Sequence, residues 1–476
     1  MKTVFVSGRF NVLHPGHVRL FQFARECGDR LVVGVERDSV AGGDAHVPEG
    51  LRLEGVRNCS LVDEAFLMTE LIEDTILRLK PAVVVKGREH EMRHNAEKTA
   101  LDAYGGKLMF GSGEVAFTSR DLIRKEFASN SSAIWSLPRV FLARHGISIE
   151  RLREILLQFA KLRVLVIGDL IVDEYITCDP LGMSQEDPTL VVKPIDAKRF
   201  VGGAGIVAAH SAGLGGKASF LTIVGDDVEA AYAQEVLHQQ SVSSHFITDT
   251  TRPTTLKTRY RCQGKTLLRV SRLHQAPIAT ELRLAVLEKA RALRDSVDLV
   301  VFSDFNYGVL PQDLVNELTS MFRDRGTILA ADSQSSSQVG DIGRFKDMDL
   351  LTPTEREARI STRNSDDGLT VLAEKLRLSA AAKNLFLKLG EEGALVCAEV
   401  TASQPWPPDQ IEALNHAPKD VAGAGDSMLI AGAMALAAGA SVWEAACLGS
   451  IAAAIQVGRL GNVPIQIKEL TEALNR

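Results

Sequence analysis

The chain has 476 residues, of which 45% are hydrophobic and 24% are charged, and its formal net charge is −6. This length predicts roughly two to four domains, large enough to bury apolar cores without disulfides or metals. The negative charge argues against a general nucleic-acid-binding protein. The six cysteines form neither a CxxC pair nor a Cys/His ligand spacing, which is typical of reduced thiols in a cytoplasmic protein.

Strand and helix patterns alternate through the first part of the chain. Short apolar runs predict strands, and stretches with apolar residues at helical spacing predict helices. The expected strands cover residues 3–8, 29–38, 59–67, 81–87 and 105–111, and the expected helices cover residues 17–27, 49–59, 70–80 and 119–129. This alternation predicts an α/β domain, a parallel sheet with helices on both faces.

A second and larger α/β unit follows a Ser/Pro-rich stretch without periodicity, residues 128–140. β-rich insertions near residues 185–201 and 253–275 interrupt the alternation of this unit. The expected boundaries are a first domain over 1–130, a linker over 131–147 and a second domain over 148–476.

One apolar stretch near the C-terminus has the length of a membrane span. Residues 427–457 hold a single charged residue, Glu444. Ala and Gly dominate the stretch, and Gly439-Ala440-Ser441 interrupts it. Two buried, closely packed helices are therefore expected rather than a span, and no membrane partner is expected.

Residues 8–17 read GRFNVLHPGH between the first strand and the first helix. In open α/β sheets, ligands bind beyond the carboxyl ends of strands and against helix N-termini. Gly16 lets a ligand approach the backbone, and His14 and His17 are placed to donate hydrogen bonds to phosphate oxygens. A structural or zinc-binding histidine pair is the alternative, although no further ligand stands at a telling spacing nearby. We therefore expect phosphate chemistry here.

With this motif, residues 1–127 resemble the nucleotidyltransferases of the cytidylyltransferase-like superfamily, whose signature is GxFDxxHxGH. The matching residues are Gly8, Phe10, His14, Gly16 and His17, followed by Arg52, Lys86 and the hydroxyl pair Thr118-Ser119. The resemblance implies a Rossmann-like domain that transfers a nucleotide to a phosphate and releases pyrophosphate. It implies that His14, His17 and Lys86 are catalytic, and that Arg52 and the hydroxyl pair contact the nucleotide. Asn11 stands where the family usually has Asp.

A second motif, DVAGAGD at residues 420–426, opens a long Ala/Gly-rich helix. The backbone N–H groups of Gly423, Ala424 and Gly425 are expected to form an anion hole, supported by the helix dipole. Asp426 lies at the helix start, where a carboxylate can take a proton from a hydroxyl that attacks the γ-phosphate of ATP. An N-capping aspartate after a glycine-rich turn is the alternative interpretation.

With this motif, residues from about 150 to 476 resemble the ribokinase-type carbohydrate kinases. Further matches lie in VLVIGDLIVDEY, FVGGAG, VFSDFNYGVL, LLTPTEREA and KLGEEGALV, the last resembling the family's strand–turn–strand before the nucleotide site. The resemblance implies a ribokinase-like domain with a β lid, ATP as phosphoryl donor and Mg²⁺ as cofactor. It implies sugar binding by Asp169, Asp173, Gly202, Gly203 and Asp304, and a magnesium-organising role for Glu357.

Three positions depart from the kinase pattern. Thr354 replaces the Asn of the NxxE motif, and Ile206 replaces the Asn that follows the di-glycine. Residues 331–337, ADSQSSS, stand where many relatives have a DPK-like run. Each departure is expected to lower kinase activity or to change the sugar.

Among sugar kinases, the second unit is most similar to the kinase half of the bifunctional heptose-7-phosphate kinase/heptose-1-phosphate adenylyltransferases, with the order of the domains reversed. Lys257, Arg259 and Arg269 are candidate cations for holding a sugar phosphate, and the alternative is that they are solvated, as basic residues near a β-rich lid more often are. The resemblance implies phosphorylation of a sugar such as heptose 7-phosphate, then transfer of a nucleotide from ATP to the sugar 1-phosphate. Both displacements need Mg²⁺ to offset triphosphate charge. The lid is similar to one that pairs subunits in related kinases, which implies a homodimer.

Two alternatives remain open at this point. In the first, one domain is catalytically inactive and serves as a ligand-binding module. In the second, both domains are active, but the substrate is a different sugar or a polyol phosphate, used with CTP. No motif distinguishes the nucleotide bases.

Overall fold

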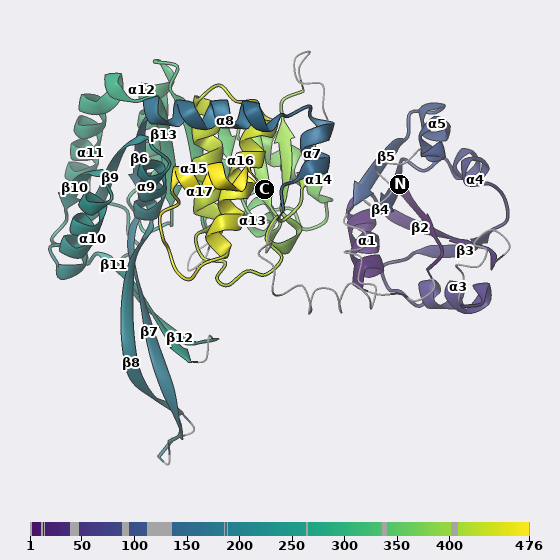
Figure 1. Ribbon diagram of the computed structural model, residues 1–476, viewed down its shortest axis with the longest axis horizontal. Coiled ribbons are helices and arrows are strands. Elements are labelled where there is room, and N and C mark those ends of the chain that lie inside the picture. Colours follow the sequence, from purple (N-terminus) through teal and green to yellow (C-terminus); the bar gives the residue numbers. More distant parts are fainter. Residues whose placement is uncertain are drawn as a thin grey trace. The chain divides into compact units, whose positions relative to one another are not determined.

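The computed structural model describes residues 2–10, 13, 15–38, 47–87, 95–111, 136–184, 186–187, 189–262, 265–335, 340–400 and 408–475. The chain divides into two compact units, one built mainly from residues 1–132 and the other mainly from residues 133–476. Figure 1 labels the helices and strands of both units. The helix expected over 119–129 lies outside the described residues.

The first unit contains a five-stranded parallel sheet. Its strands are β1 (Thr3–Gly8), β2 (Arg30–Glu36), β3 (Glu64–Met68), β4 (Val83–Gly87) and β5 (Lys107–Gly111). Its helices are α1 (Pro15–Glu26), α3 (Glu49–Arg57), α4 (Ile72–Leu79) and α5 (Ala96–Asp102). The strand order is β3-β2-β1-β4-β5, and every neighbouring pair is parallel. The order reverses beside β1, so the carboxyl ends of β1 and β4 border the crevice in which such sheets bind ligands.

Alternate residues of β1 point to opposite faces of this sheet. Val4 joins one apolar core with Phe21 of α1, and Phe5 joins a second core with Ile76 of α4 and Leu101 of α5. Helices therefore cover both faces, which confirms the predicted Rossmann-like α/β fold.

The second unit contains a nine-stranded sheet in the order β10-β9-β6-β13-β14-β15-β16-β17-β18. Its strands are β6 (Arg163–Gly168), β9 (Lys217–Val224), β10 (Ser243–Thr248), β13 (Leu299–Asp304), β14 (Ile328–Ser333), β15 (Leu350–Leu351), β16 (Asn384–Lys388), β17 (Ala394–Ala398) and β18 (Asp409–Ile411). The strands are parallel as far as β16, and β17 and β18 are antiparallel. The unit has the parallel α/β sheet that was predicted.

A separate four-stranded sheet forms the lid, in the order β12-β11-β7-β8. Its strands are β7 (Leu170–Met183), β8 (Leu190–Gly203), β11 (Thr255–Cys262) and β12 (Lys265–Arg272). β7 follows β6 almost directly, so the lid grows out of the carboxyl end of a central strand and extends away from the sheet (Figure 1). The predicted β lid is confirmed.

The remaining helices belong mainly to the second unit. They are α7 (Arg139–Arg144), α8 (Ile149–Gln158), α9 (Ala204–Gly213), α10 (Val228–Gln239), α11 (Thr280–Leu293), α12 (Gln312–Arg323), α13 (Glu355–Thr362), α14 (Leu369–Ser379), α15 (Ala424–Ala437), α16 (Val442–Val457) and α17 (Ile467–Ala473). α9, α15 and α16 contribute to one large apolar core with the sheet. A Cβ on Gly449 would lie 3.0 Å from the Met428 carbonyl oxygen, so small residues let α15 and α16 approach closely. These are the two buried helices predicted for residues 427–457.

No helix within the described ranges has both the length and the apolar character that a membrane crossing requires.

Part of the span expected as a linker is helical. α7 lies within residues 131–147, and its Phe141 and Leu142 belong to the core of the second unit. The apolar side chains of RVFLAR explain why this segment packs rather than remaining extended.

Candidate functional site

The start of helix α15 carries the GAGD motif of the second unit. Gly423 has a left-handed backbone with φ 77°, and a Cβ there would lie 2.7 Å from Asn462 Oδ1. The helix begins at the next residue, which points its first N–H groups outward. Asp426 lies in this first turn and is 6% exposed. The loop and helix start thus place a buried carboxylate at an anion-binding helix end.

Asp426 has the electrostatics of a general base. Burial, reinforced by the negative charge of Asp332, raises the pKa of Asp426 to about 7. Its Oδ1 accepts a hydrogen bond from Gln334 Nε2 at 3.2 Å. A base with a pKa near 7 accepts protons effectively at neutral pH. The sequence analysis did not predict the role of Gln334, because it treated residues 331–337 only as a departure from the DPK-like run of many relatives.

Asp332 and Lys388 lie close to Asp426, and Glu357 lies near both Asp332 and Lys388. Lys388 Nζ is 2.8 Å from Asp332 Oδ2, and burial raises the pKa of Asp332 to about 6 despite this ammonium. Glu357 Oε2 accepts from the Thr354 N–H at 2.7 Å, and Thr354 Oγ1 accepts from the Glu357 N–H at 3.2 Å. Glu357 Oε1 accepts from the Ser335 N–H at 3.0 Å. Glu357 thus caps α13 and holds the segment after β14.

The acidic side chains fit a magnesium ion brought by a nucleotide. Mg²⁺ prefers oxygen ligands and is usually bound by one or two carboxylates together with substrate phosphates. Asp332 Oδ1 is buried and has no hydrogen-bond partner among the described residues, so it has a lone pair to offer. The same described residues contain no group of three His, Cys, Asp or Glu side chains that could hold a metal alone. A direct role for Asp332 and an indirect one for Glu357 fit this geometry.

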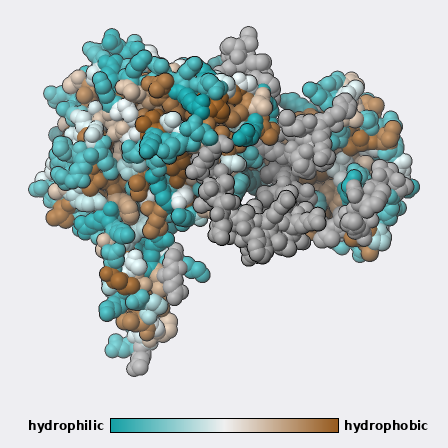
Figure 2. Space-filling view, in the orientation of Figure 1, coloured by the Kyte–Doolittle hydropathy of each residue, from teal (hydrophilic) through white to brown (hydrophobic). Residues whose placement is uncertain are grey.

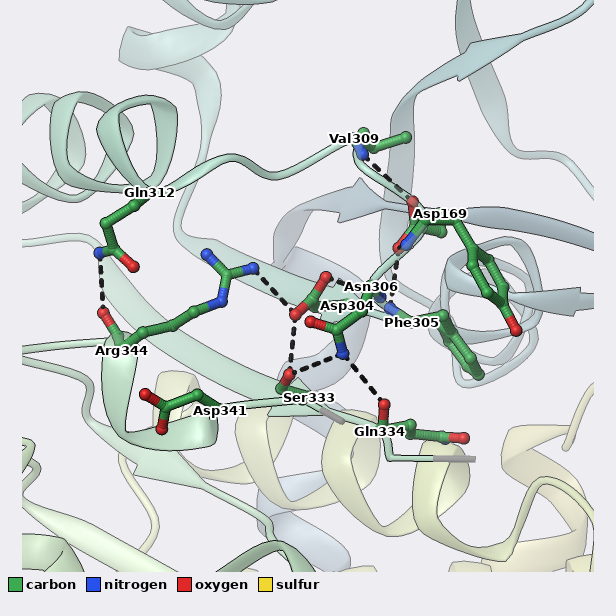
Figure 3. Close-up of polar contacts among 12 residues, drawn as sticks. Asp169, Asp304, Phe305, Asn306, Val309, Gln312, Ser333, Gln334, Asp341 and Arg344 are labelled. Atoms are coloured by element: carbon green, nitrogen blue, oxygen red, sulfur yellow. Dashed lines mark hydrogen bonds and ion pairs between the residues drawn. The ribbon is translucent and has the colours of Figure 1, made fainter. Parts of the chain in front are cut away.

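Asp169 and Asp304 hold the loop that follows β13 (Figure 3). Asp169 accepts hydrogen bonds from the N–H groups of three residues of that loop, Phe305, Tyr307 and Val309, at 2.8, 3.3 and 3.3 Å. Burial and the charge of Asp304 raise the pKa of Asp169 to about 7. Asp169 and Asp304 thus hold the loop by hydrogen bonds. A direct sugar contact by either aspartate stays a prediction.

Asp304 is the centre of its own polar network. Its Oδ2 accepts from Ser333 Oγ at 2.7 Å and from Arg344 Nη2 at 2.9 Å, and its Oδ1 accepts from the Asn306 N–H at 3.1 Å. Ser333 precedes Gln334, the residue that contacts Asp426. The network therefore fixes the segment that presents Gln334 to the base.

Asp173 and the di-glycine form one contact surface at the base of the lid. Asp173 forms an ion pair with Arg259 and accepts from Asn462 Nδ2 at 3.2 Å. A Cβ at Gly202 would lie 2.2 Å from Asp173 Oδ2, and one at Gly203 would lie 2.4 Å from a carbonyl oxygen. Glycine is therefore required at both positions. The structure brings these predicted sugar-binding residues together.

Lys257 faces the same region from lid strand β11. Its ammonium lies 5.4 Å from the centre of the Phe305 ring and 5.1 Å from that of Tyr307, within the range of cation–π attraction. Its charge also lowers the pKa of Asp426, which places it near the base. Arg259 has Asp173 as its carboxylate partner, whereas Lys257 pairs with no carboxylate among the described residues. Lys257 is thus the better placed of the two to receive an anionic acceptor group.

The candidate site of the first unit is described in part. His17 lies in α1, with its ring 5.2 Å from that of Phe10, and Phe10 has φ 47°. Lys86, near the end of β4, forms an ion pair of 2.6 Å with the buried Glu97. Gly8 ends β1, and Gly16 lies in the first turn of α1. Three predicted residues, His14, Thr118 and Ser119, lie outside the described residues.

Arg52 is fully buried and connects three segments of the first unit. It donates to the carbonyl oxygens of Val47 and Arg9 and forms an ion pair with Asp38. The carbonyl of Arg9 immediately precedes Phe10, so Arg52 fixes the loop after β1. A nucleotide contact by Arg52 stays a prediction.

Comparison with known proteins agrees with both halves of this geometry. Residues 161–467 match the family model described as pfkB family carbohydrate kinase, and residues 5–108 match the model described as cytidylyltransferase-like. The chain therefore belongs to the pfkB family of carbohydrate kinases, and it carries a cytidylyltransferase-like domain before the kinase domain. Both resemblances inferred from the sequence are confirmed.

Relatives of similar sequence carry the name bifunctional protein HldE. The chain is 32% identical over 318 residues to that of Shewanella baltica, and 27% identical over 317 residues to that of Helicobacter hepaticus. Each match covers 66% of this chain and 64% of the relative, so the chain spans less than two thirds of these curated relatives.

Solved structures of similar fold are also sugar-kinase structures. Phosphofructokinase-2 from Escherichia coli has a TM-score of 0.55 at 17% identity, over 66% of this chain and 99% of that protein. Ribokinase from Thermotoga maritima has a TM-score of 0.53 at 23% identity, over 66% and 100%. These likenesses confirm the predicted ribokinase-like fold of the second unit.

Proposed function

We propose that this protein is a bifunctional enzyme that makes a nucleotide-activated sugar. The second unit phosphorylates a hydroxyl of a sugar phosphate with ATP, and the first unit transfers a nucleotide to the sugar 1-phosphate with release of pyrophosphate. Heptose 7-phosphate is the proposed acceptor and ATP the proposed nucleotide donor, as the resemblance of the sequence to heptose-7-phosphate kinase/heptose-1-phosphate adenylyltransferases implies. The single observation that carries the kinase half is the buried Asp426 at the start of α15.

In the proposed kinase reaction, Asp426 takes the proton of the acceptor hydroxyl while the hydroxyl oxygen attacks the γ-phosphorus. The bond between the γ-phosphorus and its bridging oxygen breaks, and the electron pair leaves with ADP. Gln334 orients Asp426, and Lys257 holds an anionic group of the acceptor. When bound, Mg²⁺ offsets the triphosphate charge, and Asp332 is the residue best placed to hold it.

The test of the kinase half is Asp426→Asn in a sugar-phosphate panel with ADP release as the readout. We expect a loss of about 10²–10⁴-fold, the usual contribution of a general base. Asp295→Asn is the control, because the Asp295 side chain is 81% exposed. Turnover of Asp426→Asn within a few-fold of the unsubstituted protein would reject the base assignment.

The test of the transferase half is His17→Ala with pyrophosphate release as the readout. We expect this substitution to abolish pyrophosphate release and to leave ADP release unchanged, because His17 belongs to the first unit alone. The same panel, run with each nucleoside triphosphate, separates ATP from CTP as donor. Pyrophosphate without ADP for every sugar would favour an inactive kinase unit.

We also propose that the lid mediates a homodimer. Large apolar side chains are exposed on its strands (Figure 2), and they are Leu181, Met183, Leu190, Val191, Ile195, Leu267, Leu268 and Val270. Exposed apolar surface of this kind is typical of protein interfaces. Sedimentation equilibrium is expected to give twice the chain mass, and a monomer at micromolar concentration would reject the dimer.

A further inference from the structure

Lys388 is a buried cation that the function described so far does not use. It ends strand β16, and its side chain is 13% exposed. Taking an ammonium out of water is unfavourable unless charged or polar groups compensate for the lost hydration. Its one hydrogen bond among the described residues goes to Asp332 Oδ2 at 2.8 Å, and an ammonium has three donors. Two donors therefore remain for another partner.

The ammonium of Lys388 lies directly against the GAGD loop. A Cβ added to Gly425 would be 3.1 Å from Lys388 Nζ. Gly425 is the residue before Asp426, so the ammonium, the first turn of α15 and the proposed base occupy one corner of the site. The glycine leaves room for the lysine to reach this corner, which a larger side chain would fill.

The charge at this corner favours an anionic ligand beside the lysine. Helix N-terminal N–H groups and an ammonium attract the same kind of group, a phosphate. The acceptor oxygen must attack beside Asp426, so a phosphate bound between Asp426 and Lys388 would be the one being transferred. Neutralising the charge on a transferring phosphoryl group is the main contribution of protein side chains to such reactions.

We infer that Lys388 binds the γ-phosphate of ATP during transfer, an assignment that rests on the proposed kinase function. The lysine keeps its proton throughout, and its two remaining donors point to phosphate oxygens. An alternative explanation makes Lys388 only the structural partner of Asp332. The two explanations differ in what happens when Asp332 is made neutral.

The experiment is a double-mutant cycle in the full-length protein. Lys388→Met, Asp332→Asn and the double variant are compared by kcat and by KM for ATP and for the sugar, with ADP as a competitive inhibitor. We expect Lys388→Met to lower kcat/KM for ATP by about 10²–10³-fold, with the KM for the sugar and the inhibition constant of ADP changed less than about 3-fold, because ADP lacks the γ-phosphate. Because residues in direct contact couple, the loss caused by Lys388→Met is expected to be smaller with Asp332→Asn present, but still at least about 10-fold, since the phosphate contact is lost in either background.

The double variant removes both charges of the buried pair, so it is expected to fold even where Lys388→Met alone leaves Asp332 unpaired. Lys383→Met is the matched control, because Lys383 pairs with Asp349 and its side chain is 61% exposed. No further loss from Lys388→Met in the Asp332→Asn background would overturn the inference and leave the kinase proposal standing. Absence of sugar-dependent ADP release in the unsubstituted protein would overturn both.

Discussion

The single hydrogen bond from Gln334 to Asp426 is expected to tune the proposed base. A hydrogen bond to a charged group contributes about 1.5–3 kcal/mol, and this one favours the ionised form of Asp426. Gln334→Leu should therefore raise the pKa of Asp426 further and move the acidic limb of the kcat/KM profile up by about 1 pH unit. The loss of activity should be largest below pH 7 and small at pH 9. Gln312→Leu, at an exposed amide of α12, is the control.

An unchanged pH profile for Gln334→Leu would show that this hydrogen bond does not act on the base. A loss of activity that is equal at every pH would point instead to a shifted loop. Both outcomes are measured from the same set of steady-state rates between pH 5.5 and pH 9.

The buried Asp426 is expected to lower stability at neutral pH. Its pKa is about 7 in the folded protein, against an ordinary value of 3.8. Between these values the unfolded chain loses the proton while the folded protein retains it, so stability falls as the pH rises through this window and the full cost applies above pH 7. Asp426→Asn removes this cost and should raise the free energy of unfolding by roughly 1–3 kcal/mol at pH 8.

Denaturant unfolding at pH 8 and pH 5 checks this prediction. The gain from Asp426→Asn should shrink by more than half at pH 5, whereas Asp295→Asn should give a small effect at both values. A gain of the same size at both pH values would mean that the titration of Asp426 is not its cause.

At the scale of elements, helix α13 shows how Thr354 fills the position of the family's asparagine. Thr354 and Glu357 form a reciprocal capping box at the helix start. Thr354→Ala should destabilise the protein by about 1 kcal/mol, and Thr354→Asn should retain most of the cap, because both Thr and Asn accept from the helix N–H groups. Thermal unfolding of the two variants measures the difference. Equal destabilisation by Ala and Asn would argue against capping as the role of Thr354.

Elements with regular periodicity could be predicted from the sequence, and residues that meet only through the sheet could not. Most strands of the two large parallel sheets and the α15–α16 pair followed from apolar runs, whereas the edge strands β10 and β18 were not predicted. The seven-residue helix α5 did not, because it is short and buries the charged Glu97. Gln334 follows β14 and Lys388 ends β16. Both strands are neighbours of β15 in the sheet, but the two residues are 54 positions apart in the sequence. For Gln334 no local pattern gives a link to Asp426, whereas KLGEEGALV, which begins at Lys388, resembles the family's strand–turn–strand before the nucleotide site.

At the scale of the whole molecule, the apolar cores described for the two units have no residue in common. The cores of the first unit draw on residues between Val4 and Met109, and the large core of the second unit draws on residues from Leu137 to Leu474. Cooperative unfolding follows a shared core, so the two units are expected to unfold in separate transitions. A ligand that binds one unit should then stabilise that unit alone.

Matched substitutions of fully buried phenylalanines test this independence. Phe21→Ala in the first unit and Phe220→Ala in the second should each cost about 3–5 kcal/mol. We expect Phe21→Ala to lower the midpoint of one denaturant transition and Phe220→Ala to lower that of the other, with ADP release surviving Phe21→Ala. Circular dichroism follows the transitions, and added ADP and Mg²⁺ identify the kinase unit, since bound nucleotide raises its midpoint. A single transition that both substitutions lower equally would mean that the units fold as one, despite their separate cores.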